Sequence, residues 1–280
     1  MNTLFTIPIP PLGPHKGGSI TATSPASNPK IYLLSITSPP DTRLTHATCQ
    51  ALLDALDLIE FGGYPPGVLV TTSSIPKFYS NGLDLDLAFA DEKFLPGYLY
   101  RLFRRLVTYP MPTVALLNGH AFAGGLMLAL HHDYRIMNPT KGFLCVNELD
   151  FGVPLKPAMS AIFRIKLPPR TYRQLVLEAH RFDGKSALEA GIVDGLGGFE
   201  EVLRFVEAKK LTKKGETGIY GLMKAEMYRE SVELLTEEGH VQGEERQRRM
   251  IEEDEERKEL GRRRAEEILK GGKGKGGAKL

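Results

Sequence analysis

An α/β fold is predicted for the first ~150 residues of this 280-residue chain. Short apolar runs with strand-like composition alternate there with longer segments whose apolar residues recur every three or four positions. This alternation is typical of folds in which helices cover a largely parallel sheet. From Pro157 onward the pattern becomes helical, so we expect a group of helices to follow the sheet.

The predicted strands are short apolar runs bounded by residues that favour turns. Strands are expected at residues 31–36, 67–72, 113–117, 134–137 and 143–146. Residues 1–27 are interpreted as an N-terminal segment that precedes the sheet.

The first predicted helix begins after Thr45, whose hydroxyl can accept a hydrogen bond from an unpaired N–H of the first turn. Leu52, Leu56 and Ile59 form its apolar stripe, and the pair Gly62–Gly63 ends it. Further helices are expected at 95–106, at 124–132, from Asp183 to Gly191, at 199–210 and at 219–236.

Composition excludes several classes of protein. Hydrophobic residues make up 42% of the chain, which is enough for a core and argues against a disordered protein. No apolar stretch approaches the ~20 residues that cross a bilayer. The net charge of +2 gives no general reason to expect nucleic-acid binding. The two cysteines, Cys49 and Cys145, indicate neither a disulfide framework nor a metal site.

Two glycine-containing turns are the candidates for a binding site: SNGLD at 80–84 and NGHAFAGG at 118–125. Each lies past the carboxyl end of a predicted strand, where open α/β sheets bind ligands. The second turn opens an apolar helix, whose unpaired amides and dipole favour a negatively charged oxygen. Neither turn matches a phosphate-binding loop or a dinucleotide fingerprint. Taken alone, the glycines also fit two tight turns that only the fold requires.

Three motifs occur in the order and spacing of one protein family. They are KFYSNGLDL, VALLNGHAFAGGLMLALHHDYRIM and FDGKSALEAGIVD. Together they make the chain resemble the crotonase superfamily, also called the enoyl-CoA hydratase/isomerase family, over about residues 28–240. The resemblance implies a spiral of repeated ββα units followed by C-terminal helices. It also implies an acyl-CoA substrate, with no metal or redox cofactor.

The resemblance gives two backbone amides a chemical role. The N–H groups of Leu83 and Gly124 would form an oxyanion hole that polarises the thioester carbonyl and stabilises its enolate. Neighbouring residues of the two turns would contact the substrate, namely Ser80, Asn81, Gly82, Asp84 and Gly125.

Acid–base residues distinguish the reactions within this family. Its hydratases resemble one another in having two Glu residues, one on the helix after the second glycine turn and one in a following loop. In this chain the helix position is Met127, and the loop position is Glu148. One Glu resembles the pattern of Δ3-Δ2-enoyl-CoA isomerases, above all the peroxisomal ones, in which a single base moves a proton from the alpha to the gamma carbon. The resemblance therefore implies isomerisation of 3-enoyl-CoA to 2-trans-enoyl-CoA in fatty acid β-oxidation.

Several alternatives stay open. A lone Glu in a loop is usually solvated, although apolar neighbours of Glu148 predict a setting that would raise its carboxyl pKa. These neighbours are Phe143, Val146, Leu149 and Phe151. His120, His131 and His132 have no second cluster of ligands to support a metal, and Cys145 fits a buried strand better than a nucleophile. The chain could also catalyse another crotonase reaction, or bind acyl-CoA without turnover.

The C-terminal part divides into two regions. Residues 199–240 resemble the helices through which crotonase relatives form trimers or hexamers, so we expect a homotrimer or hexamer. Residues 244–270 contain 19 charged residues of mixed sign at helical spacings, which predicts a solvated helix. The apolar residues expected to be buried in the first region are Val202, Phe205, Val206, Leu222, Met223, Val232 and Leu235, and Met227 is expected to pack beside Met223.

The sequence ends in Ala278-Lys279-Leu280, a close variant of the Ser-Lys-Leu peroxisomal address. It predicts a peroxisomal location and an import receptor as partner, with a chance match as the alternative. The predicted organisation is therefore an N-terminal segment (1–27), a crotonase core (28–198), an oligomerisation region (199–240) and a charged helix with a flexible tail (241–280).

Overall fold

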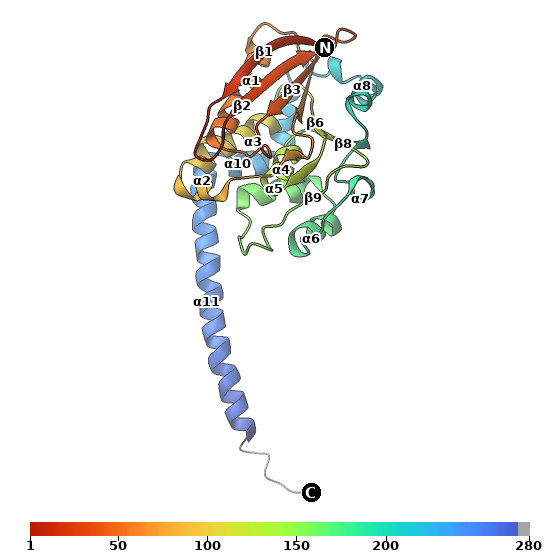
Figure 1. The fold of residues 1–280 in the computed structure, drawn as a ribbon. Coiled ribbons are helices and arrows are strands. Elements are labelled where there is room, and N and C mark those ends of the chain that lie inside the picture. Colours follow the sequence, from red (N-terminus) through yellow and green to blue (C-terminus); the bar gives the residue numbers. More distant parts are fainter. Residues whose placement is uncertain (274–280) are drawn as a thin grey trace.

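The computed structural model describes residues 1–273, which are built around a seven-stranded sheet (Figure 1). Its strands lie in the order β1-β2-β3-β4-β6-β8-β10. The first three strands are antiparallel, and β3 to β10 are parallel to one another. Their bounds are β1 (Asn2–Ile9), β2 (Gly18–Ser24), β3 (Ile31–Thr37), β4 (Val68–Ser73), β6 (Thr113–Leu117), β8 (Tyr134–Met137) and β10 (Gly195–Leu196).

A second, three-stranded parallel sheet has the order β5-β7-β9. Its strands are β5 (Phe78–Ser80), β7 (His120–Phe122) and β9 (Leu144–Cys145). Each follows a strand of the large sheet and precedes a helix. These helices are α2 (Leu85–Ala90), α4 (Gly124–Leu130) and α5 (Pro157–Lys166). The predicted repeat of ββα units is thereby confirmed.

The N-terminal hairpin is the main difference from the sequence-based expectation. Residues 1–27 contain β1 and β2, which extend the large sheet beyond β3 and bury Ile9 and Ile20. Prolines obscured these strands, because Pro8 lies within β1. A proline is tolerated there because β1 is an edge strand, where a missing N–H breaks no ladder.

Helix α1 (His46–Phe61) begins and ends as predicted, with Thr45 accepting a hydrogen bond from the Thr48 N–H and Gly62 closing the helix. The predicted helix at 95–106 is a π-helical turn, η1 (Leu95–Leu99), followed by α3 (Tyr100–Val107). The C-terminal part is helical, as expected. It comprises α6 (Pro169–Leu177), α7 (Gly184–Glu189), α8 (Phe199–Ala208), η2 (Leu211–Lys213), α9 (Tyr220–Met227), α10 (Arg229–Leu234) and α11 (Glu237–Lys273).

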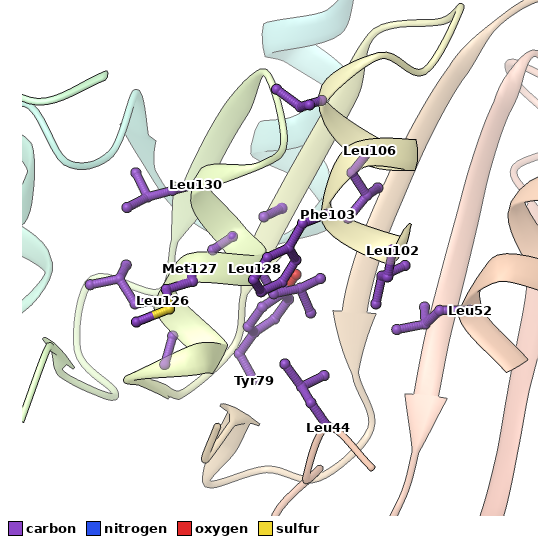
Figure 2. Close-up of a cluster of buried hydrophobic side chains, with 14 of the residues drawn as sticks. Leu44, Leu52, Tyr79, Leu102, Phe103, Leu106, Leu126, Met127, Leu128 and Leu130 are labelled. Atoms are coloured by element: carbon purple, nitrogen blue, oxygen red, sulfur yellow. The ribbon is translucent and has the colours of Figure 1, made fainter. Parts of the chain in front are cut away.

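The main core joins the sheets to α1, α3 and α4. Figure 2 shows part of it, where Tyr79, Phe103 and Met127 lie together. Every residue of α4 is buried, which fixes the helix that follows the second glycine turn. A smaller core joins the large sheet to α8 and includes Val114 and Val202.

Two helices of the C-terminal part expose residues outside the core: α11 and α9. Helix α11 projects away from the sheets as a single helix (Figure 1), and Gly261 does not interrupt it. On α9, Met223 and Met227 are 66% and 70% exposed, so their predicted packing is wrong within the single chain. Leu222 is likewise 70% exposed. Within residues 1–273, no helix is both long and apolar enough to span a membrane.

Candidate active site

A cavity of about 260 Å³ lies between the two glycine turns and the loop that follows β9. Its polar lining comprises Arg43, Asn81, Asn147, Glu148 and Lys156, and Leu83 and Gly124 of the two glycine turns also line it. The remaining walls are largely apolar, from Leu85, Ala88, Phe89, Leu95, Phe122, Met127, Phe151, Val153, Pro154, Leu155 and Met159. A largely apolar cavity with a few converging polar groups is typical of a binding site.

The first turn brings Leu83 to the cavity wall. Gly82 has a φ of +78°, which an L side chain rarely adopts, and a Cβ there would lie 2.9 Å from the Phe122 carbonyl oxygen. The two glycine turns are therefore in direct contact. Within the described part of the chain, the Leu83 N–H donates no hydrogen bond to another protein group.

The second turn positions Gly124 at the start of α4. Ala123 has a φ of +48°, a strained conformation for a residue with a Cβ. The Gly124 N–H opens the helix, and it too has no protein acceptor among residues 1–273. At Gly125 a Cβ would lie 2.3 Å from the Ser80 carbonyl oxygen, so glycine is required for the close approach of the turns.

Glu148 lies in the loop between β9 and α5. Burial raises the pKa of its carboxyl group to about 7, partly opposed by a hydrogen bond from its own backbone N–H. Its Oε2 is buried without a partner in the described chain. Of the apolar neighbours predicted for Glu148, Val146 is buried, whereas Leu149 and Phe151 are exposed. These neighbours therefore account for only part of the burial of the Glu148 carboxyl group.

Glu148 is the one acid among the described residues that line the cavity. Met127 lies on the adjoining wall and is only 1% exposed. The helix position that holds a second Glu in hydratases thus presents a thioether, which neither accepts nor donates a proton at neutral pH.

The other residues predicted to contact substrate lie behind the cavity wall. Ser80 is fully buried and donates to the Thr42 carbonyl, at 2.8 Å. Asp84 caps α2 by accepting from the Leu87 N–H, at 3.1 Å, and its Oδ2 lies 2.7 Å from His15 Nε2. Partial burial would raise the pKa of Asp84, but these hydrogen bonds outweigh it and the pKa is lowered. Gly82 and Gly125 are also buried; of the predicted set, Asn81, Leu83, Gly124 and Glu148 reach the cavity.

The structure does not support metal binding by His131 and His132, or a nucleophilic role for Cys145. His131 and His132 are fully buried, and burial lowers both pKa values to about 3. His131 Nδ1 lies 2.7 Å from the Met127 carbonyl, and His132 Nε2 lies 2.9 Å from Thr71 Oγ1. Burial also raises the pKa of Cys145 to about 11, which keeps it a thiol. Residues 1–273 contain no cluster of three His, Cys, Asp or Glu suited to a metal.

A family model described as "Enoyl-CoA hydratase/isomerase" matches residues 27–273. The chain belongs to the enoyl-CoA hydratase/isomerase family. Enoyl-CoA delta isomerase 1, peroxisomal, of Arabidopsis thaliana is 32% identical over 72% of this chain and 87% of its own length. Enoyl-CoA delta isomerase 2, peroxisomal, of the same plant is 32% identical over 75% of this chain and 94% of its own length. A carnitinyl-CoA dehydratase of Salmonella typhi is 28% identical over 71% of this chain and 76% of its own length.

Solved structures of the family share the fold. An enoyl-CoA hydratase from Mycobacterium marinum has 25% identity and a TM-score of 0.66, over 77% of this chain and 94% of that one. A probable enoyl-CoA hydratase from Mycobacterium tuberculosis has 24% identity and a TM-score of 0.70, over 84% of this chain and 98% of that one. The predicted family and the predicted crotonase fold are confirmed.

Two basic cavity residues were missed by the sequence analysis. Arg43 precedes Leu83 by 40 positions and lies in the loop between β3 and α1. Lys156 precedes α5, and its Nζ lies 2.5 Å from Glu244 of α11. Neither residue lies in a family motif, so no local pattern marked them.

Proposed function

We propose that the protein is a Δ3-Δ2-enoyl-CoA isomerase, which converts 3-enoyl-CoA to 2-trans-enoyl-CoA. The observation that carries this proposal is the single carboxylate of the cavity. Glu148 has a raised pKa, while Met127 occupies the second acid position. One base is sufficient for an isomerase, because the proton it removes is returned to the same substrate.

The thioester oxygen would accept hydrogen bonds from the N–H groups of Leu83 and Gly124. The ionised Glu148 would remove a proton from carbon 2, leaving a dienolate whose negative charge rests largely on that oxygen. Protonated Glu148 would then return the proton to carbon 4. The double bond moves from carbons 3 and 4 to carbons 2 and 3, and Glu148 ends ionised as it began. A pKa of about 7 suits both halves of this shuttle.

The relatives support this assignment, since two are named peroxisomal enoyl-CoA delta isomerases. The proposed chemistry uses the CoA thioester as substrate and needs no further cofactor. The dehydratase relative favours a second candidate, the addition or removal of water. A third is acyl-CoA binding without catalysis.

The decisive experiment supplies the purified protein with 3-enoyl-CoA and 2-enoyl-CoA of several chain lengths. Isomerisation that is lost in Glu148→Gln, with acyl-CoA binding retained, is the expected result. Rapid release of 3-hydroxyacyl-CoA from 2-enoyl-CoA would instead favour the hydratase. Binding without turnover of either substrate would favour the silent binding protein.

We further propose that the isomerase acts in peroxisomal β-oxidation. The names of the plant relatives and the Ala278-Lys279-Leu280 tripeptide support this location; the tripeptide lies outside the described residues. A fluorescent fusion at the N-terminus should be punctate and should become diffuse when the tripeptide is deleted. Puncta that survive the deletion would show that the tripeptide is not the address.

Assembly as a homotrimer or hexamer is also a proposal. The exposed apolar side chains at the start of α9 and along it support it, namely Ile219, Leu222, Met223 and Met227. Apolar surface gathered on one helix is typical of a subunit contact.

A further inference from the structure

Three consecutive carbonyl groups in the first glycine turn are all held by one dipeptide, Arg43-Leu44. Arg43 Nη1 donates to the carbonyl oxygen of Asn81, at 3.1 Å, and to that of Leu83, at 2.6 Å. The backbone N–H of Leu44 donates to the Gly82 carbonyl between them, at 2.9 Å. The turn is therefore fixed from the side of its carbonyl groups.

This arrangement determines where the Leu83 N–H points. The Gly82 carbonyl and the Leu83 N–H belong to one planar peptide unit, in which the two groups point in opposite directions. Holding the carbonyl against Leu44 therefore turns the N–H away from that dipeptide. Because Leu83 lines the cavity and its N–H has no protein acceptor in residues 1–273, the amide is free for a ligand.

Arg43 is itself held in place. Its Nε donates to Asp41 Oδ2, at 2.9 Å, and the same oxygen accepts from Asn81 Nδ2, at 2.6 Å. The Asn81 N–H also donates to the Asp41 carbonyl, at 3.0 Å. The Arg43 side chain is 30% exposed, and it borders the cavity. The planar fork of a guanidinium can bridge two carbonyls in a way that the single ammonium of Lys reproduces poorly.

We propose that Arg43 is a positioning residue, which holds the first glycine turn so that the Leu83 N–H meets the negative oxygen formed during the reaction. The proposal rests on the proposed function, because it assigns Leu83 the role of an oxyanion donor. Arg43 acts through the Asn81 and Leu83 carbonyls, which flank the peptide unit of the Leu83 N–H on either side. Its contribution therefore grows as negative charge develops on the substrate oxygen.

The test compares Arg43→Met with Arg43→Lys and with the control Arg104→Met. Arg104 is an exposed arginine on α3 that does not line the cavity. Displacing one donor should lower kcat about 30- to 100-fold, with KM changed less than about threefold, since misplacement by ~1 Å costs ~100-fold. Lys should recover part of the loss. The control should match the wild type.

A second readout follows the oxyanion directly. Acetoacetyl-CoA ionises to an enolate that absorbs in the near ultraviolet, and its pKa on the protein reports stabilisation of the negative oxygen. Arg43→Met should raise this pKa, while the affinity for saturated acyl-CoA stays unchanged. If that variant does not fold, Asp41→Ala keeps the Arg43 charge but removes its side-chain anchor, and should shift the enolate pKa in the same direction.

Three results would overturn the inference. They are an unchanged kcat with an unchanged KM, a rise in KM with kcat retained, or an unchanged enolate pKa, each measured on a folded Arg43→Met. The second would make Arg43 a direct contact for the CoA portion. Failure of the proposed function is a separate outcome, because wild-type protein would then show no isomerisation. The enolate titration would still test the role of Arg43.

Discussion

Replacing Glu148 with Gln is expected to abolish isomerisation and to stabilise the fold at alkaline pH. Burial raises the carboxyl pKa from 4.5 to about 7. A group whose pKa is raised in the folded state favours folding when protonated. That contribution is fully present below pH 4.5 and is lost as the pH rises through 7. At pH 8 the wild type therefore holds a buried carboxylate that the unfolded chain would solvate.

The magnitude follows from the size of the shift. At 1.36 kcal/mol per pKa unit, a rise from 4.5 to about 7 corresponds to about 3 kcal/mol at pH 8. Gln is neutral at every pH, so the free energy of unfolding of Glu148→Gln should be about 3 kcal/mol higher than that of the wild type at pH 8. At pH 5 the difference should fall to about 1 kcal/mol, because the folded wild type is then protonated.

Urea unfolding of both proteins at pH 5 and pH 8 measures this difference, and an isomerase assay on the same samples measures activity. The wild-type kcat/KM should rise with pH through about 7, since only the ionised Glu148 can accept a proton. Equal stabilities at both pH values would refute the buried setting of Glu148. Near-normal turnover in the variant would refute its role as the base.

Three further predictions concern other parts of the chain. Because Met127 supplies no carboxylate, hydration of 2-enoyl-CoA should be at least ~100-fold slower than isomerisation, measured as 3-hydroxyacyl-CoA released; comparable rates would contradict this. Lys224→Met should lower the free energy of unfolding by about 3–5 kcal/mol in a urea titration, since Lys224 Nζ lies 2.9 Å from the buried Asp133 carboxylate, which would lose its ion-pair partner. Adding Asp133→Asn should recover part of that loss. Leu222→Asp with Met223→Asp should yield monomers in light scattering, and an unchanged oligomer mass would remove this face from the subunit contact.

The elements that could be predicted from the sequence are those with a periodic or capped signal. Thr45 and Gly62 bound α1 because a side-chain acceptor and a glycine act within one helical turn. Of the second sheet, β9 lies within the strand predicted at 143–146, whereas β5 and β7 could not be predicted, since segments of three residues show no alternation. Their pairing depends on the large sheet that brings them together.

The candidate site divides in the same way. Leu83, Gly124 and Glu148 lie in motifs whose family roles can be transferred position by position, and they line one cavity. Arg43 could not be predicted, because its contacts with Asn81 and Leu83 depend on the register between two loops far apart in the chain. The exposure of Met223 was missed because an amphipathic pattern indicates an apolar face without saying whether its partner belongs to the same chain.

The two buried histidines that follow the last residue of α4 make the stability of this protein depend on pH. His131 and His132 are neutral in the fold, with pKa values lowered to about 3, whereas in an unfolded chain each titrates near 6.5. Their contribution to stability is full above pH 6.5 and is lost as the pH falls towards 3. At pH 5 each histidine would lower the free energy of unfolding by about 2 kcal/mol, a large part of the 5–15 kcal/mol that is typical of a folded protein. In an acidic compartment such as a lysosome or vacuole, the folded protein would therefore be less stable and more open to proteolysis than at neutral pH.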